Sequence, residues 1–162
     1  MKEELKNEIE ILTNIILEIR RRRKDEHYEI IDTENSNKFK SLITNHIIPM
    51  VKDASSIVGR SGCSLNYYSN ELAVIRDPKK RIFIQILFYP YGHSKVTLGV
   101  NAPFLQFAYS PLRENIKITE KISIKSDEGR TKIAEIEIDD FAQDKIDNYI
   151  LSFLRDTIMF NS

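Results

Sequence analysis

Residues 115–138 read NIKITEKISIKSDEGRTKIAEIEI, and the period-two alternation of this stretch decides the fold. Its apolar positions are Ile116, Ile118, Ile122 and Ile124, followed by Ala134, Ile136 and Ile138. Because alternate side chains of a strand point to opposite faces, each half predicts a strand with one buried face. The turn at 126–129 joins the two strands. Lysines of the first strand then face Glu135 and Glu137 of the second, which stabilises the hairpin.

The same alternation runs back to Cys63, so we predict that residues 63–138 form an antiparallel sheet of five or six strands. A turn around Pro78 and a reversal at 89–93 separate successive strands, because proline and glycine favour turns. The remaining candidate strands lie at 71–76, 81–89, 95–100 and 104–109.

Apolar residues at helical spacing precede this sheet. They predict a helix over 37–58, capped by Ser36 or Asn37. Pro49 removes a backbone donor, so we expect a kink, or two helical pieces that meet, near His46–Pro49. The polar stretch 24–37 is interpreted as a connector that holds at most one short strand.

A further helix is predicted over 140–160, capped by Asp140 with Gln143 three residues later. Strands that follow one another without intervening helices indicate α+β rather than α/β. The expected architecture is therefore an antiparallel β-meander packed against N-terminal and C-terminal helices, in a single domain spanning 1–162.

Length and composition exclude several classes of protein. The 162 residues contain 41% hydrophobic and 30% charged residues, which is ordinary for a globular domain and unlike a disordered chain. The 24 basic and 24 acidic residues cancel, which excludes a polybasic coat for nucleic acid. A single cysteine makes neither an internal disulfide nor a four-cysteine zinc site.

The termini and residue usage bear on location. Acidic residues stand near the N-terminus where a secretory signal needs a basic region, and no stretch of about 20 apolar residues is present. We therefore expect a cytoplasmic protein without a membrane span. Abundant isoleucine and scarce alanine indicate an AT-rich, bacterial genome.

A heptad-spaced helix over 3–23, within an N-terminal helical segment 1–24, is the main candidate interaction surface. Its seam consists of Leu5, Ile9, Leu12, Ile16 and Ile19, spaced 4-3-4-3. This spacing is typical of a coiled coil. Ile11 and Ile15 widen the apolar stripe, so a helix face buried in a globular core is an equal alternative. The coiled-coil alternative predicts helix-mediated homodimerisation.

Basic residues form the second candidate surface. They are Arg20, Arg21, Arg22, Arg23 and Lys24 at the end of the first helix, with Arg76, Lys79, Lys80 and Arg81 in a hairpin. Single-stranded nucleic acid binders combine basic and aromatic side chains, and this hairpin is accompanied by Lys95 and by Tyr67, Tyr68, Tyr89 and Tyr91. The alternative is that the basic run complements the helix dipole, since five consecutive helical residues point around the whole cylinder.

The charge balance is a cancellation between unlike segments. Residues 38–100 carry 9 basic and 3 acidic residues, whereas 101–162 carry 8 and 11. A nucleic acid or another polyanion therefore stays among the candidate partners.

Catalytic patterns are weak. Cys63 as a nucleophile needs His46 or His93 as its base, and nothing in the sequence places these groups together. The histidines are isolated, and we expect His46 to be a hydrogen-bonded residue at the boundary of the core. The strand glutamates Glu135 and Glu137 have lysines of the preceding strand as partners, and the acidic residues of 139–147 are interpreted as a solvated surface. No metal site is therefore predicted. We expect no cofactor, no small-molecule substrate and no enzymatic activity.

The leading interpretation is a non-enzymatic cytosolic domain that binds itself or a partner protein, as an adaptor, chaperone or immunity-like protein. The alternative is binding of nucleic acid or another polyanion through residues 20–24 and the 76–81 hairpin.

Overall fold

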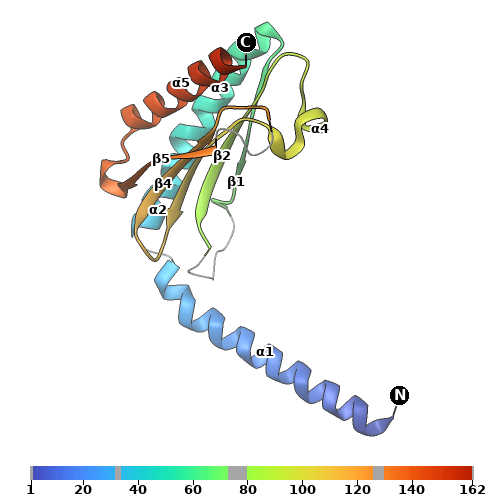
Figure 1. Ribbon diagram of the computed structural model, residues 1–162. Helices are drawn as coiled ribbons and strands as arrows, with labels where there is room; N and C mark the ends of the chain where they lie inside the picture. The colour runs from blue at the N-terminus through green and yellow to red at the C-terminus, as the bar shows by residue number, and fades with distance from the viewer. Residues whose placement is uncertain (1, 32–33, 73–79, 126–129, 162) are drawn as a thin grey trace.

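The computed structural model describes residues 2–31, 34–72, 80–125 and 130–161, with the backbone alone for 22–31 and 130–132. Helices come first, a five-stranded sheet follows, and one long helix ends the chain (Figure 1). The fold class is α+β, as the sequence predicts.

The first helix, α1 (Glu3–Ile31), is longer than expected. The prediction of a connector over 24–37 is wrong, because α1 continues to Ile31 and α2 (Glu34–Leu42) begins directly after residues 32–33, which lie outside the described residues. The stretch 24–31 contains neither glycine nor proline, so nothing in its composition interrupts the helical hydrogen-bond ladder.

The prediction that two helical pieces meet near Pro49 is confirmed. Between α2 and α3 (Ile48–Val58) the chain forms a π-helix, η1 (Ile43–Ile47), and Pro49 stands in the first turn of α3. Proline has no N–H to donate to the carbonyl four residues earlier, and its ring clashes there. The wider π-turn relieves that clash. Neither residue predicted to cap this helix does so, because Ser36 is buried inside α2 and Asn37 follows it.

The strands β1 (Ser64–Ser69), β2 (Ile82–Tyr89), β3 (Phe104–Ser110), β4 (Asn115–Lys121) and β5 (Arg130–Glu137) form one sheet. Their order is β1-β2-β3-β4-β5 and every neighbouring pair is antiparallel, so the sheet is a meander. The predicted meander of five or six strands is confirmed with five.

Two of the predicted strands are corrected. Residues 71–72 form a turn rather than a strand, 73–79 lie outside the described residues, and the first strand is instead β1. Residues 95–100 form α4 (Lys95–Leu98) and a 3-10 turn, η3 (Gly99–Asn101). The N–H of Ser94 donates to Thr97 Oγ1 over 2.8 Å, a local bond that stabilises a helical turn over an extended strand.

The β4–β5 hairpin is confirmed, with Lys117 opposite Glu135. It is shorter than predicted because β4 ends at Lys121, which faces Arg130 rather than a glutamate. Lys121 is buried and donates instead to the carbonyls of Asn101, over 2.8 Å, and Ser123. These bonds turn the chain away from the sheet after β4.

The C-terminal helix, α5 (Gln143–Phe160), begins later than predicted. Asp140 does not cap it, because Ile138–Asp140 form a 3-10 turn (η4) and the N-cap is Ala142. Phe141, between the two helices, is buried in the core, and its ring lies 5.1 Å from Phe107. Burying that ring separates the 3-10 turn from α5.

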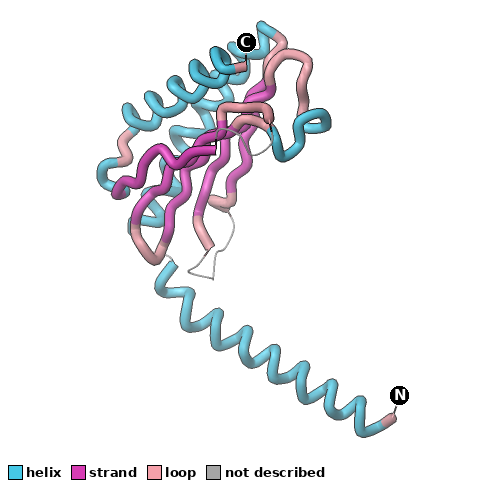
Figure 2. The backbone as a smooth tube through the Cα atoms, in the orientation of Figure 1, coloured by secondary structure: helices cyan, strands magenta, loops and turns pink. Residues whose placement is uncertain are grey.

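The core lies between one face of the sheet and the helices α2, α3 and α5, and Figure 2 draws these helices in cyan and the strands in magenta. It is rich in large side chains such as Phe39, Phe107, Tyr109 and Phe153. A smaller apolar cluster on the other face joins Leu87, Tyr89, Ala102 and Phe104. Among the described helices, none has the length and apolar character needed to span a bilayer.

Candidate interaction surface

The α1 seam (Leu5, Ile9, Leu12, Ile16 and Ile19) is exposed. Its five side chains retain between 45% and 59% of their accessible surface. Of the α1 side chains that the structure describes, residues 3–21, only Glu18 is less than exposed. Figure 1 shows α1 extending away from the rest of the chain. The seam therefore does not pack against the sheet.

The apolar face of α1 is wider than its seam. Ile11 and Ile15 are 59% and 49% exposed and extend the face to one side. At about 100° of rotation per residue, the seam together with Ile11 and Ile15 covers about 160° of the helix circumference. Leu17, 56% exposed, lies on the other side of the helix. A contiguous exposed apolar face of this kind is typical of an interaction surface.

The remainder of the chain has a complete core without α1. Neither apolar cluster includes a residue from the described part of α1. In contrast, α2, α3 and α5 each bury side chains, Phe39, Val51 and Ile150 among them. The part from α2 onward, which we call the body, thus forms the described core without a side chain from residues 3–21.

Charges are distributed unevenly along α1. Glu3 and Glu4 lie in its first turn, where the helix dipole favours anions. The basic run 20–24 lies in the second half of α1 but ahead of its last turn, so the expectation that it ends the helix and complements the dipole there is wrong. Arg21 contacts Glu18 over 2.9 Å at the helix surface, where Arg21 is exposed and Glu18 is partly covered. A surface pair of this kind contributes little stability.

The structure distributes the predicted basic residues over separate elements. Arg20 and Arg21 are exposed on α1, and Arg22, Arg23 and Lys24 lie within the same helix, where only the backbone is described. Lys80 and Arg81 are exposed where the chain enters β2. Arg76 and Lys79 fall outside the described residues.

Part of the predicted aromatic and basic mixture does assemble. Lys95 Nζ lies 5.3 Å from the centre of the Tyr68 ring, a cation–π distance. Hydrogen bonding to Tyr68 raises the pKa of Lys95, and burial raises the pKa of Tyr89 nearby. Tyr67, the next residue to Tyr68, packs against the core instead. Lys95 thus already has an aromatic partner within the chain.

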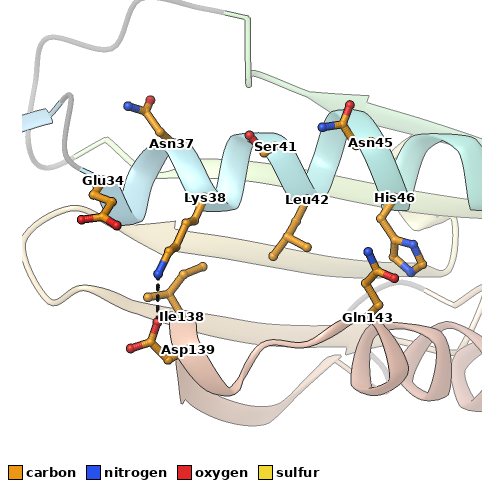
Figure 3. Close-up of a pocket in the computed structure, with 10 residues that line it drawn as sticks. All are labelled: Glu34, Asn37, Lys38, Ser41, Leu42, Asn45, His46, Ile138, Asp139 and Gln143. Atoms are coloured by element: carbon orange, nitrogen blue, oxygen red, sulfur yellow. Dashed lines mark hydrogen bonds and ion pairs between the residues drawn. The ribbon is translucent and has the colours of Figure 1, made fainter.

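A cleft of about 850 Å³ lies between α2–η1 on one side and η4–α5 on the other (Figure 3). Its lining consists of Glu34, Asn37, Lys38, Ser41, Leu42, Asn45, His46, Ile138, Asp139 and Gln143. Across the cleft, Lys38 Nζ lies 3.3 Å from Asp139 Oδ1. His46 Nε2 lies 2.7 Å from Asp147 Oδ1 of α5. Polar contacts thus link the two sides.

These contacts do not form a catalytic arrangement among the described residues. A serine nucleophile needs its hydroxyl within hydrogen-bond reach of a histidine, and Figure 3 shows Ser41 pointing away from His46. Cys63 is half-buried and packs against the core, and His93 is exposed in a loop. The described residues hold no group of three His, Cys, Asp or Glu side chains placed to bind a metal ion.

Sequence reasoning did not find the cleft. The Lys38–Asp139 and His46–Asp147 pairs each join residues 101 positions apart, so no local pattern indicates them. The expectation that His46 is a hydrogen-bonded residue at the core boundary is confirmed.

Comparison of the chain with protein-family models, with curated proteins and with solved structures yields no match. The candidate surfaces are therefore judged on their own geometry.

Proposed function

We propose that this chain is a non-enzymatic interaction domain that associates with a second copy of itself through the α1 seam. The observation that carries the proposal is a 29-residue helix whose apolar face is exposed and lies outside the body. Helices in proteins gain most of their stability from packing an apolar face against a partner, and a helix left alone is marginally stable. A partner surface for α1 is therefore expected.

The energetic gain comes from the exposed part of the seam. Burying an isoleucine or leucine side chain completely is worth about 1.5–3 kcal/mol, and each seam residue is about half exposed. The seam offers five such side chains from each copy, of which four meet apolar partners in a given antiparallel register, and Ile15 adds another at its edge. Water that covers this face in the monomer is released on association.

A second copy fits this face better than an unrelated partner. Two helices with 4-3 apolar spacing interlock side chains as knobs into holes, and identical helices match this spacing by construction. Residues 1–27 carry 7 basic and 7 acidic residues, so two copies meet without net repulsion.

Charged substitutions in the seam test the proposal. Ile9→Asp and Ile16→Asp place a carboxylate in the contact, and burying an unpaired carboxylate is strongly unfavourable. We expect each to raise the dimer dissociation constant at least tenfold, measured by light scattering at micromolar concentration.

Leu17→Asp is the matched control. It makes the same kind of change at similar exposure on the other side of α1 and should leave the dimer intact. A chain that is monomeric at micromolar concentration, with a mass that neither seam variant changes, would overturn the proposal.

Polyanion binding is the second candidate function, and exposed Arg20, Arg21, Lys80 and Arg81 favour it. It predicts retention on heparin or an RNA oligomer that decreases with salt. Arg21→Glu and Lys80→Glu should each reduce retention, and unchanged retention in both would contradict this function.

We also propose that the protein acts in the cytoplasm of a bacterium. The single, half-buried Cys63 suits a reducing compartment, and the isoleucine-rich composition suits an AT-rich genome. A fluorescent fusion distributed evenly through the cell would support this location, and recovery from the periplasm would contradict it.

A further inference from the structure

We infer that the two copies of α1 associate antiparallel, with Ile9 of one copy facing Ile19 of the other. This inference rests on the proposed function and adds the orientation and the register of the pair. It is carried by the charge distribution along α1 together with the spacing of its exposed seam.

The charge distribution selects the orientation. Residues 3–10 carry four glutamates and one lysine, the stretch 11–19 carries one charge at Glu18, and residues 20–24 are all basic. In a parallel pair, the basic runs of the two copies lie beside each other, and so do the two acidic segments. In an antiparallel pair, each basic run lies beside an acidic segment. Like charges within the Debye length of about 8–10 Å repel, so the antiparallel pair is favoured.

The seam permits two antiparallel registers. In the first, Ile9 faces Ile19 of the second copy and Leu12 faces Ile16. In the second, Ile9 faces Leu12 of the second copy and Leu5 faces Ile16. Each register forms four apolar layers from side chains that are exposed in the monomer, so apolar contacts alone do not choose between them.

The charges and Ile15 choose the first register. There the basic run 20–24 lies beside residues 4–8 of the second copy, within the acidic segment. At the centre of the helix pair, Ile15 of one copy lies close to Ile15 of the other. In the second register the acidic segment 3–10 lies beside residues 11–18 of the second copy, so the basic run lies outside that segment. Ile15 then lies near Glu8, which leaves an exposed isoleucine beside a carboxylate.

The pair has a definite shape in this arrangement. A helix of 29 residues is about 43 Å long, and the two copies overlap over most of that length. The body follows α1 directly in the chain. The two bodies therefore lie at opposite ends of the helix pair rather than side by side.

Disulfide trapping tests this orientation directly. In a Cys63→Ser background, Ile9→Cys and Ile19→Cys chains carrying tags of different mass are mixed and oxidised. A disulfide needs Cα atoms about 4.4–6.8 Å apart. In the proposed pair, residue 9 of one copy and residue 9 of the other are about 15 Å apart along the helix axis. We expect rapid cross-linking in the mixture and at least tenfold slower cross-linking of either variant alone.

Other outcomes overturn the inference in distinguishable ways. Rapid cross-linking of Ile9→Cys with itself would establish a parallel pair. Rapid cross-linking of Ile9→Cys with Leu12→Cys, but not with Ile19→Cys, would establish the second register. In both cases the dimer, and with it the proposed function, would stand. A monomer by light scattering would overturn both. Because the described side chains of α1, residues 3–21, lie outside the core, we expect these substitutions to leave the folding of the body unaffected.

Discussion

Helices α1 and α5 are the two longest helices of the chain, and both carry an apolar stripe, but only α5 buries its stripe. α5 packs Ile146, Ile150 and Phe153 against the sheet, whereas every seam residue of α1 is exposed. Their apolar periodicity is alike, so periodicity indicates that a helix has a partner without indicating which one. The difference lies in side-chain type: the core is rich in aromatic rings, and the α1 stripe is entirely aliphatic.

The largest expected effect separates the body from α1 by stability. Phe107 is fully buried and contacts Phe141 and Tyr149. Phe107→Ala should lower the free energy of unfolding by about 3–5 kcal/mol, because it leaves a cavity. Ile16→Ala, in a chain kept monomeric by Ile9→Asp, should lower it by less than about 1 kcal/mol. Urea denaturation measures both, and equal losses would show that α1 is part of the core.

Removing residues 1–31 should have a smaller effect on the body. No described residue of α1 belongs to the core, so the shortened chain should unfold cooperatively with a free energy within about 1 kcal/mol of the monomeric full chain. It should also be a monomer at every concentration. A shortened chain without cooperative unfolding would show that the body depends on α1.

Salt should weaken the dimer by about tenfold between 50 and 500 mM, because attraction between unlike charges is screened. Arg20→Glu combined with Arg21→Glu should weaken it similarly, whereas Arg113→Glu, an exposed arginine of the body, should not. Sedimentation equilibrium measures the dissociation constant. A dimer that salt strengthens would indicate like charges in contact, as in a parallel pair.

The smallest expected effect lies within the body. Burial, together with the charge of Asp156, raises the pKa of Glu120 above its usual value. The folded state then holds this proton more tightly than the unfolded state, so Glu120 lowers stability as pH rises above about 4.5. Glu120→Gln should raise the denaturation midpoint at pH 7, and the gain should disappear on acidification below pH 4.5.

Glu137→Gln, at an exposed position of β5, is the control for this pH dependence and should leave the midpoint unchanged. A gain from Glu120→Gln that persists at low pH would show that its cause is not the charge.

Where the pattern is local, the sequence predicts the fold well. The isoleucine alternation around Ile116 and Ile136 indicates the β4–β5 hairpin, and Pro49 indicates the break between α2 and α3. Predictions failed where long-range contacts decide. β4 stops at Lys121 because the lysine reaches the carbonyl of Asn101, 20 residues earlier in the chain. The start of α5 depends on the burial of Phe141.

The candidate surfaces show the same difference between local sequence patterns and long-range contacts. The seam from Leu5 to Ile19 is visible in the sequence, but its exposure is not, because a helix buried in a core has the same spacing. The cleft between Lys38 and Asp139 has no sequence signal, because its two sides come from opposite ends of the chain.

The mass of the unaltered chain in solution tests the central claim most directly. Light scattering after size-exclusion chromatography, over a range of micromolar concentrations, should give about twice the chain mass of 18.9 kDa. Dilution, or Ile16→Asp, should return the mass to that of one chain. A mass of 18.9 kDa at every concentration would contradict self-association through α1.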